Sequence, residues 1–196
     1  TTPAEVIPLA TAFIDGVTRS GVTPIVKHIP GMGRADIDSH QSLPVVKTPV
    51  SILEQSDWIP FQVVSGTRWA MTAHIVIPEW DQEPITTSER AISHIRSLFG
   101  DRMIVSDCLT MGAMTGAIEE RIQQTLDAGV DLALFSNGSD EERRRAVEAS
   151  GDPRVIREEP IELKTLPSST LEMLLQKLRA VPTPIQSADP TWDRRN

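Results

Sequence analysis

The 196-residue sequence has one cysteine, no tyrosine and only 4% aromatic residues, and it lacks a long apolar run. A single cysteine cannot form an internal disulfide or, alone, a thiolate metal site, so we expect a cytoplasmic protein. No apolar segment reaches the roughly 20 residues that cross a bilayer, and the first residues lack the basic and apolar regions of a signal peptide. Membrane insertion and export are therefore not expected. The first residue is Thr1 rather than methionine, which is compatible with a longer parent chain.

Basic side chains are fewer than acidic ones, 19 against 27, and the formal net charge is −8. Such a charge repels polyanions unless the basic groups cluster on one face. The one short basic run, residues 143–145, directly follows three acidic residues at 140–142, so the local charges nearly cancel. Nucleic acid is therefore not an expected partner.

Short apolar segments alternate with segments of helical periodicity along the chain. The expected buried strands are 23–27, 69–74, 103–106 and 132–135. The expected helices lie at about 9–20, 50–65, 88–99, 114–128, 140–150 and 168–180. This alternation predicts an α/β fold whose parallel strands are joined by crossover helices.

The ends of the chain differ in character. Thr2, Pro3 and Glu5 fit a helix start with a capping box, whereas the interior proline Pro8 favours a start near residue 9, so both starts remain open. Residues 182–196 carry three prolines among polar residues, which predicts a poorly ordered tail after a domain at 1–181. A closed TIM-type (β/α)8 barrel needs eight strand–helix units and about 250 residues. The four units predicted here make about half of one.

One loop carries most of the polar residues with chemical potential. In the segment KHIPGMGRADIDSH, residues 27–40, Lys27 and His28 come at the end of the first strand, where barrel enzymes place their chemistry. Asp38 and His40 are two apart, so in an extended loop both side chains point the same way. A carboxylate beside an imidazole fixes its tautomer and favours its protonated form, which suits proton transfer.

A second candidate follows the third strand. Asp107 would emerge at the end of that strand, where a carboxylate can attack an electrophilic carbon and later be displaced by water. An aspartate at a strand–helix junction is equally typical of a helix N-cap. Both interpretations of Asp107 remain open from the pattern alone.

Taken together, several segments resemble a known family. They are KHIPGMG at 27–33, DSH at 38–40, LP at 43–44, MTAH at 71–74, VSDCLTMGAM at 105–114 and DAGVDL at 127–132. Over about residues 5–140 the chain resembles the bacterial β-N-acetylhexosaminidases of glycoside hydrolase family 3, cytoplasmic enzymes that act in peptidoglycan recycling. The resemblance implies that this chain is the second half of the catalytic barrel. It also implies a retaining mechanism on muropeptides through a covalent glycosyl-enzyme.

The resemblance assigns roles to particular residues. Asp107 matches the nucleophile, His40 the acid/base and Asp38 its dyad partner. The residues expected to bind the sugar are Lys27, His28, Arg34 and His74. The family pattern implies no cofactor. A divalent metal on Asp38, His40 and His28 is the alternative, but three scattered ligands make it unfavourable, so no metal is expected.

The chain also departs from the family pattern. Met32 stands where the family has a histidine, which removes a polar contact from the loop. Cys108 follows the nucleophile, where the family often has a second acid. Trp58 and Trp69 are expected to pack between helix and strand, whereas a stacking role on sugars stays open for Trp80 and Trp192.

Two hypotheses of different classes follow. The first is a β-N-acetylglucosaminidase half-barrel that acts on an N-acetylglucosamine-containing glycan or muropeptide. Its exposed strand edges would recruit the missing first half-barrel or a second copy. The second is a non-catalytic remnant that binds a partner chain or a sugar.

Overall fold

The computed structural model describes residues 2–64, 66–151 and 176. The chain divides into two units, Thr1–Glu162 and Leu163–Asn196, and every element below belongs to the first. The expected helix at 168–180, of which only Gln176 is described, and the expected tail at 182–196 lie outside the described residues.

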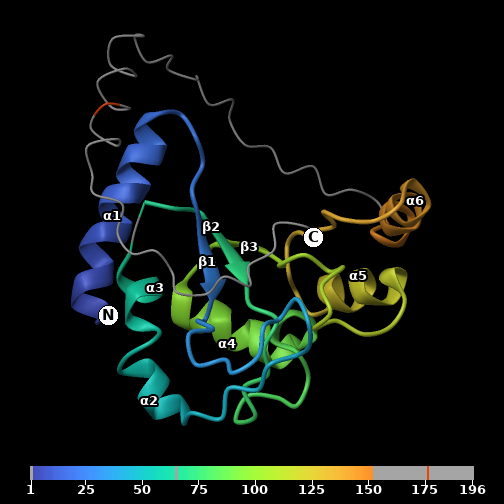
Figure 1. Cartoon of the computed structure of the whole chain (residues 1–196), viewed down its shortest axis with the longest axis horizontal. Helices are drawn as coiled ribbons and strands as arrows, with labels where there is room; N and C mark the ends of the chain where they lie inside the picture. The colour runs from blue at the N-terminus through green and yellow to red at the C-terminus, as the bar shows by residue number, and fades with distance from the viewer. Residues whose placement is uncertain (1, 65, 152–175, 177–196) are drawn as a thin grey trace. The chain divides into compact units, whose positions relative to one another are not determined.

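A parallel sheet forms the centre of the first unit (Figure 1). Its strands are β1 (Ile25–Ile29), β2 (Trp69–Thr72) and β3 (Met103–Val105), hydrogen-bonded in the order β1-β2-β3. The pairing is parallel throughout, with Trp69 beside both Ile25 and Met103. The predicted α/β fold with crossover connections is confirmed for these three strands.

The fourth expected strand, 132–135, is present only as a bridge between Val105 and Leu132. The chain still runs along β3, since Ser106 donates its backbone N–H to the carbonyl of Leu132 at 2.9 Å. Further along the same segment, the backbone N–H of Leu134 donates to the side-chain hydroxyl of Ser106 at 2.8 Å, and not to a backbone carbonyl of the neighbouring strand. This side chain takes the place of a ladder carbonyl and interrupts the regular strand.

Within residues 2–64 and 66–151 the structure contains seven helical segments. They are α1 (Pro3–Arg19), α2 (Val50–Glu54), α3 (Ile59–Val63), the 3₁₀ turn η1 (Ile85–Thr87), α4 (Glu89–Phe99), α5 (Ile118–Asp127) and α6 (Asp140–Ala149). The earlier of the two starts considered for the first helix is the correct one, because Thr2 donates its N–H to the Glu5 carboxylate at 2.7 Å. Pro8 lies within this helix.

Two predicted helices are wrong in extent. The helix expected at 50–65 is split, because Pro60 is accommodated only in the first turn of a helix and α3 therefore begins at Ile59. The helix expected at 114–128 begins only at Ile118, since Gly116 adopts a φ of 92°, a left-handed conformation that a helix cannot include. Both boundaries are set by single residues.

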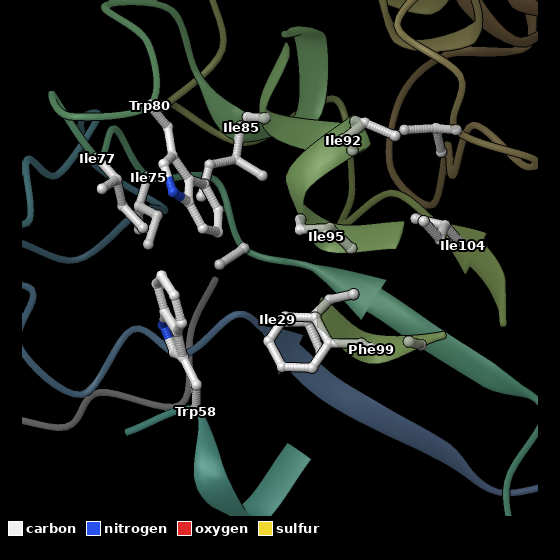
Figure 2. Close-up of a cluster of buried hydrophobic side chains, with 14 of the residues drawn as sticks. Ile29, Trp58, Ile75, Ile77, Trp80, Ile85, Ile92, Ile95, Phe99 and Ile104 are labelled. Carbon is white, nitrogen blue, oxygen red and sulfur yellow. The ribbon is translucent and has the colours of Figure 1, made fainter. Parts of the chain in front are cut away.

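The main core lies between the sheet and the segments around α2 and α4 (Figure 2). Its largest members, all nearly or fully buried, include Ile29, Trp58, Ile75, Trp80, Ile92, Ile95 and Ile104. The indole rings of Trp58 and Trp80 face each other with centroids 4.9 Å apart. A smaller cluster around Leu109, Ile118 and Ile122 packs α5 against α6. The main cluster thus packs against the ends of β1 and β2 and holds them in place.

Truncating Trp58 tests how far this core stabilises the fold. Trp58→Ala should lower the free energy of unfolding by about 3–5 kcal/mol, because it leaves a cavity between Trp80 and Phe99. Trp58→Phe should cost less, since the buried indole N–H of Trp58 has no hydrogen-bond partner within the described residues. Urea denaturation followed by circular dichroism at one protein concentration measures both. Equal losses for the two variants would contradict the packing explanation.

Candidate active site

The carboxyl ends of β1 and β3 place two functional side chains together. His28 lies near the end of β1, and Asp107 follows β3 by two residues. His28 Nε2 and Asp107 Oδ2 are 3.3 Å apart, and their side chains are only 24% and 16% exposed. The parallel sheet therefore brings together two residues that are 79 positions apart in the sequence (107 − 28).

Asp107 is not the N-cap of the next helix. That helix, α5, begins at Ile118, and its N-cap is Ala117. The other carboxylate oxygen of Asp107 accepts the backbone N–H of Cys108 at 2.8 Å. Asp107 is thus held at both oxygens at a strand end, which removes the N-cap alternative.

His28 is neutral at neutral pH. Burial lowers its pKa below the ordinary value, and the charges of Lys27 and His40 lower it further, against the opposing effect of Asp107. A neutral imidazole still carries one N–H, so His28 can donate a hydrogen bond to the Asp107 carboxylate. Lys27 itself is exposed. The peptide bond between Lys27 and His28 is cis.

Asp38 and His40 form the expected pair. Asp38 Oδ1 accepts hydrogen bonds from the backbone N–H and from Nδ1 of His40, both at 2.9 Å. These hydrogen bonds hold the pKa of the Asp38 carboxyl below its usual range, so Asp38 is an acceptor and His40 Nδ1 is the donor. His40 Nε2 is left available for proton transfer. The side chain of His40 is 74% exposed and that of Asp38 is 57% exposed. Among the described residues, no hydrogen bond or ion pair joins either of them to Asp107.

The loop that carries this pair is anchored at several points. Arg34 Nε lies 2.9 Å from Asp57 Oδ2, so this predicted sugar-binding residue is already engaged in an ion pair. Its contact with a sugar stays a prediction. Met32, which was expected to weaken the loop, packs against the main core cluster. The loop is therefore attached to the turn between α2 and α3 and to the core.

His74 lies behind the site. Its side chain is fully buried, with Nδ1 2.8 Å from the Thr86 hydroxyl and Nε2 3.1 Å from the carbonyl oxygen of Cys108. Burial lowers the pKa of His74, so the neutral ring donates one N–H to that carbonyl and accepts from Thr86. His74 thus supports the backbone beside Asp107, and its predicted contact with a sugar stays a prediction.

Cys108 has an unusual set of hydrogen bonds. Its Sγ lies 2.9 Å from the Ser136 hydroxyl, 3.3 Å from the Ser136 backbone nitrogen and 3.0 Å from the Thr110 hydroxyl. Burial alone would raise the pKa of the thiol, but these hydrogen bonds outweigh it and bring the pKa to about 7. This lowered pKa makes the Cys108 thiol more acidic than an ordinary cysteine, directly after Asp107 in the chain. The sequence offered no signal for Ser136 or Thr86, because neither stands in a motif.

Three of the four tryptophans belong to the core. Trp58, Trp69 and Trp80 are at most 8% exposed, which leaves no face for a sugar. His94 stacks on Trp80 with ring centroids 5.1 Å apart, and Trp192 lies outside the described residues. Within residues 2–64 and 66–151 no three His, Cys, Asp or Glu side chains are placed to hold a metal ion. No helix in this part of the chain is long and apolar enough to cross a membrane.

Comparison with known proteins places this site in a family. The model of the glycosyl hydrolase family 3 N terminal domain matches residues 1–159. The chain belongs to glycosyl hydrolase family 3. The domain of this family is a TIM-barrel-type fold, in agreement with the parallel sheet and with the site at its carboxyl edge.

Individual family members show how much of a relative this chain represents. The β-hexosaminidase of Neisseria meningitidis serogroup B is 34% identical over 182 residues, covering 89% of this chain and 50% of that protein. The β-hexosaminidase of Tolumonas auensis is 37% identical over 142 residues, covering 69% and 42%. The solved structure of NagZ from Neisseria gonorrhoeae in complex with N-trifluoroacetyl-D-glucosamine is 28% identical with a TM-score of 0.67, covering 89% and 52%. The chain thus spans about half the length of these relatives.

Removing the Ser136 hydroxyl tests the electrostatics of Cys108. Ser136→Ala should raise the pKa of the thiol from about 7 toward the ordinary value of about 8.5, because a donor to the thiolate is lost. Ultraviolet absorbance of the thiolate during a pH titration measures it, with the exposed Ser93→Ala as the control. The folded thiol has the lower pKa, so its contribution to stability is present above the unfolded pKa and is lost as pH falls through about 7. An unchanged midpoint in Ser136→Ala would contradict this explanation.

Proposed function

We propose that the chain is the second half of the catalytic barrel of a retaining β-N-acetylglucosaminidase. The observation that carries the proposal is the arrangement of Asp107, paired with His28 at the strand ends, together with an Asp38–His40 dyad on the adjoining loop. A carboxylate nucleophile and a separate proton donor are the two groups that retaining glycoside hydrolysis requires. The activity belongs to the completed barrel.

In the first step, Asp107 attacks the anomeric carbon of the sugar. A bond forms between a carboxylate oxygen and that carbon while the bond from the carbon to the leaving oxygen breaks. His40, as imidazolium, gives its Nε2 proton to the leaving oxygen and becomes neutral. His28, whose Nε2 lies 3.3 Å from Asp107 Oδ2, stands beside the carboxylate and limits the directions in which it can turn.

In the second step, water replaces the carboxylate. Neutral His40 takes a proton from the water at Nε2, the water oxygen bonds to the anomeric carbon, and the ester bond to Asp107 breaks. The Asp38 carboxylate accepts the Nδ1 hydrogen bond throughout and stabilises the imidazolium that forms. The two displacements together retain the anomeric configuration.

The substrate class comes from the relatives. The relatives are β-hexosaminidases, and the N. gonorrhoeae structure contains a glucosamine derivative. We therefore infer an N-acetylglucosamine-containing glycan as substrate, with Lys27 and His28 next to its hydroxyls and Arg34 in the covering loop. More specifically, we propose that the substrate is a muropeptide of peptidoglycan recycling and that the protein acts in the cytoplasm.

An apolar groove on this chain offers a surface against which the missing first half of the barrel could pack. It has a volume of about 550 Å³ and is lined by α1, α3 and the start of β1, including Leu9, Phe13, Ile25 and Phe61. Leu9 and Phe13 are each 72% exposed. β1 also pairs with no strand on its outer side within the described residues. We propose that the first half of the barrel packs in this groove and pairs with β1.

Replacing Asp107 tests the nucleophile. The chain would be co-expressed with the unmatched half of the N. meningitidis relative to complete the barrel. Asp107→Ala should lower kcat on an aryl β-N-acetylglucosaminide by about 10³-fold or more, because no glycosyl ester forms. Azide, which can enter the vacated space, should restore turnover and yield the α-glycosyl azide. The exposed Asp101→Ala is the control, and turnover of Asp107→Ala within about tenfold of the parent would overturn the assignment.

The isolated chain should not be an efficient enzyme. We expect light scattering to show self-association, and aryl β-N-acetylglucosaminide turnover to stay below about 1 s⁻¹ until the missing half is supplied. Phe13→Glu should block complementation because it places a charge in the groove. Val147→Glu, at an equally exposed apolar residue of α6, should not. A well-folded, fully active monomer would refute the half-barrel.

A further inference from the structure

Two backbone hydrogen bonds join the dyad loop to the segment that follows Asp107. Ala113 donates its N–H to the carbonyl of Ser39 at 3.0 Å, and Gly112 donates its N–H to the carbonyl of His40 at 3.1 Å. Ser39 is 2% exposed, although Asp38 and His40 on either side of it extend their side chains into solvent. The loop is therefore fastened at its central residue by its backbone.

Gly112 makes this contact possible because it has no side chain. A Cβ at this position would lie 2.5 Å from the carbonyl oxygen of His40 and 2.7 Å from that of Gln41. Both are backbone atoms, so neither can move aside by rotating a side chain. The φ of Gly112 lies outside the left-handed region, and an alanine would not strain the local backbone. The three atoms nearest to such a methyl group all belong to the backbone of the dyad loop.

The dyad turn docks as a preformed unit. The Asp38 carboxylate accepts from the backbone and ring of His40, and the Asp38 carbonyl accepts the N–H of Gln41 at 2.9 Å. The other attachments of the loop act on its flanks: Arg34 binds Asp57, and Val46 donates its N–H to Val76 at 2.8 Å. Close to Asp38 and His40, the loop is attached to the rest of the site by its backbone hydrogen bonds with Gly112 and Ala113.

The docking segment is itself rigidly linked to Asp107. Met111 donates its N–H to the carbonyl of Cys108 at 3.1 Å, and Arg121 Nη1 donates to the carbonyl of Leu109 at 2.7 Å. Asp107 and the loop of His40 therefore rest on one short piece of backbone, residues 107–113.

We propose that Gly112 is a positioning residue that sets the place of the His40 imidazole relative to Asp107. This inference rests on the proposed function. Since both dyad side chains are exposed, side-chain packing does not hold them, and the backbone contact fixes their distance from the nucleophile. Displacing the loop should impair proton delivery by His40 and leave the Asp107–His28 pair in place.

The contact itself is tested first, before any substitution, in the barrel completed by co-expression. Amide hydrogen exchange measured by NMR should show Gly112 and Ala113 protected about tenfold or more relative to an unbonded loop amide. In Gly112→Ala, peptides covering residues 35–43 should exchange faster, and trypsin should cleave after Arg34 sooner. Gly16→Ala, which adds a methyl group in open space on α1, should change neither. Unprotected amides in the parent chain would overturn the proposal without any variant.

The positioning role is tested in the completed barrel with two leaving groups. Gly112→Ala should lower kcat on an alkyl β-N-acetylglucosaminide by about tenfold or more beyond its effect on a nitrophenyl glycoside, because only the alkyl leaving group needs a proton. Equal losses on both substrates would overturn positioning through His40. Inactivity of the parent barrel on both would refute the proposed function instead, while the exchange measurements would still decide whether the loop is docked.

Discussion

The candidate site depends on the parallel register of three short strands. β1 and β3 are not hydrogen-bonded to each other, and β2 lies between them and sets the separation at which their carboxyl ends lie. Only this arrangement brings His28 within 3.3 Å of Asp107. The buried residues beneath, from Ile29 to Trp80, hold the strand ends in place, so the chemistry of the site and the packing of the core rest on the same elements.

The surroundings of Asp107 combine a neutral histidine with a thiol of low pKa. Burial lowers the pKa of His28 and favours its neutral form, so the ring beside Asp107 does not carry a full positive charge. Hydrogen bonds from Ser136 and Thr110 lower the pKa of the Cys108 thiol, directly after Asp107 in the chain. His74 fixes the backbone carbonyl of the same residue from the buried side. Asp107 thus lies between His28 and its sequence neighbour Cys108, whose Sγ is in turn hydrogen-bonded to Ser136 and Thr110.

The sequence was sufficient to predict the strands β1, β2 and β3, the pairing of Asp38 with His40, and the strand-end position of Asp107. These depend on apolar runs and on spacings of two residues, which are local signals. The split at Pro60 and the late start of α5 were equally local and were missed because the apolar periodicity was given more weight than the proline and the glycine. Ser136 and Gly112 could not be predicted, since each matters only through contact with a distant segment of chain. The partial loss of the fourth strand has the same origin, because it depends on the Ser106 side chain.

The pairing of the strands also determines how the site can come apart. Ile25 pairs with Trp69, and Trp69 with Met103, so each contact closes a long stretch of chain and must overcome the entropy of doing so. β2 contributes no side chain to the reaction, yet its detachment would separate His28 from Asp107 in a single event. The free energy of that local opening therefore sets an upper limit on the fraction of time for which the site exists, and a substitution in β2 can reduce activity without changing any group that touches the sugar.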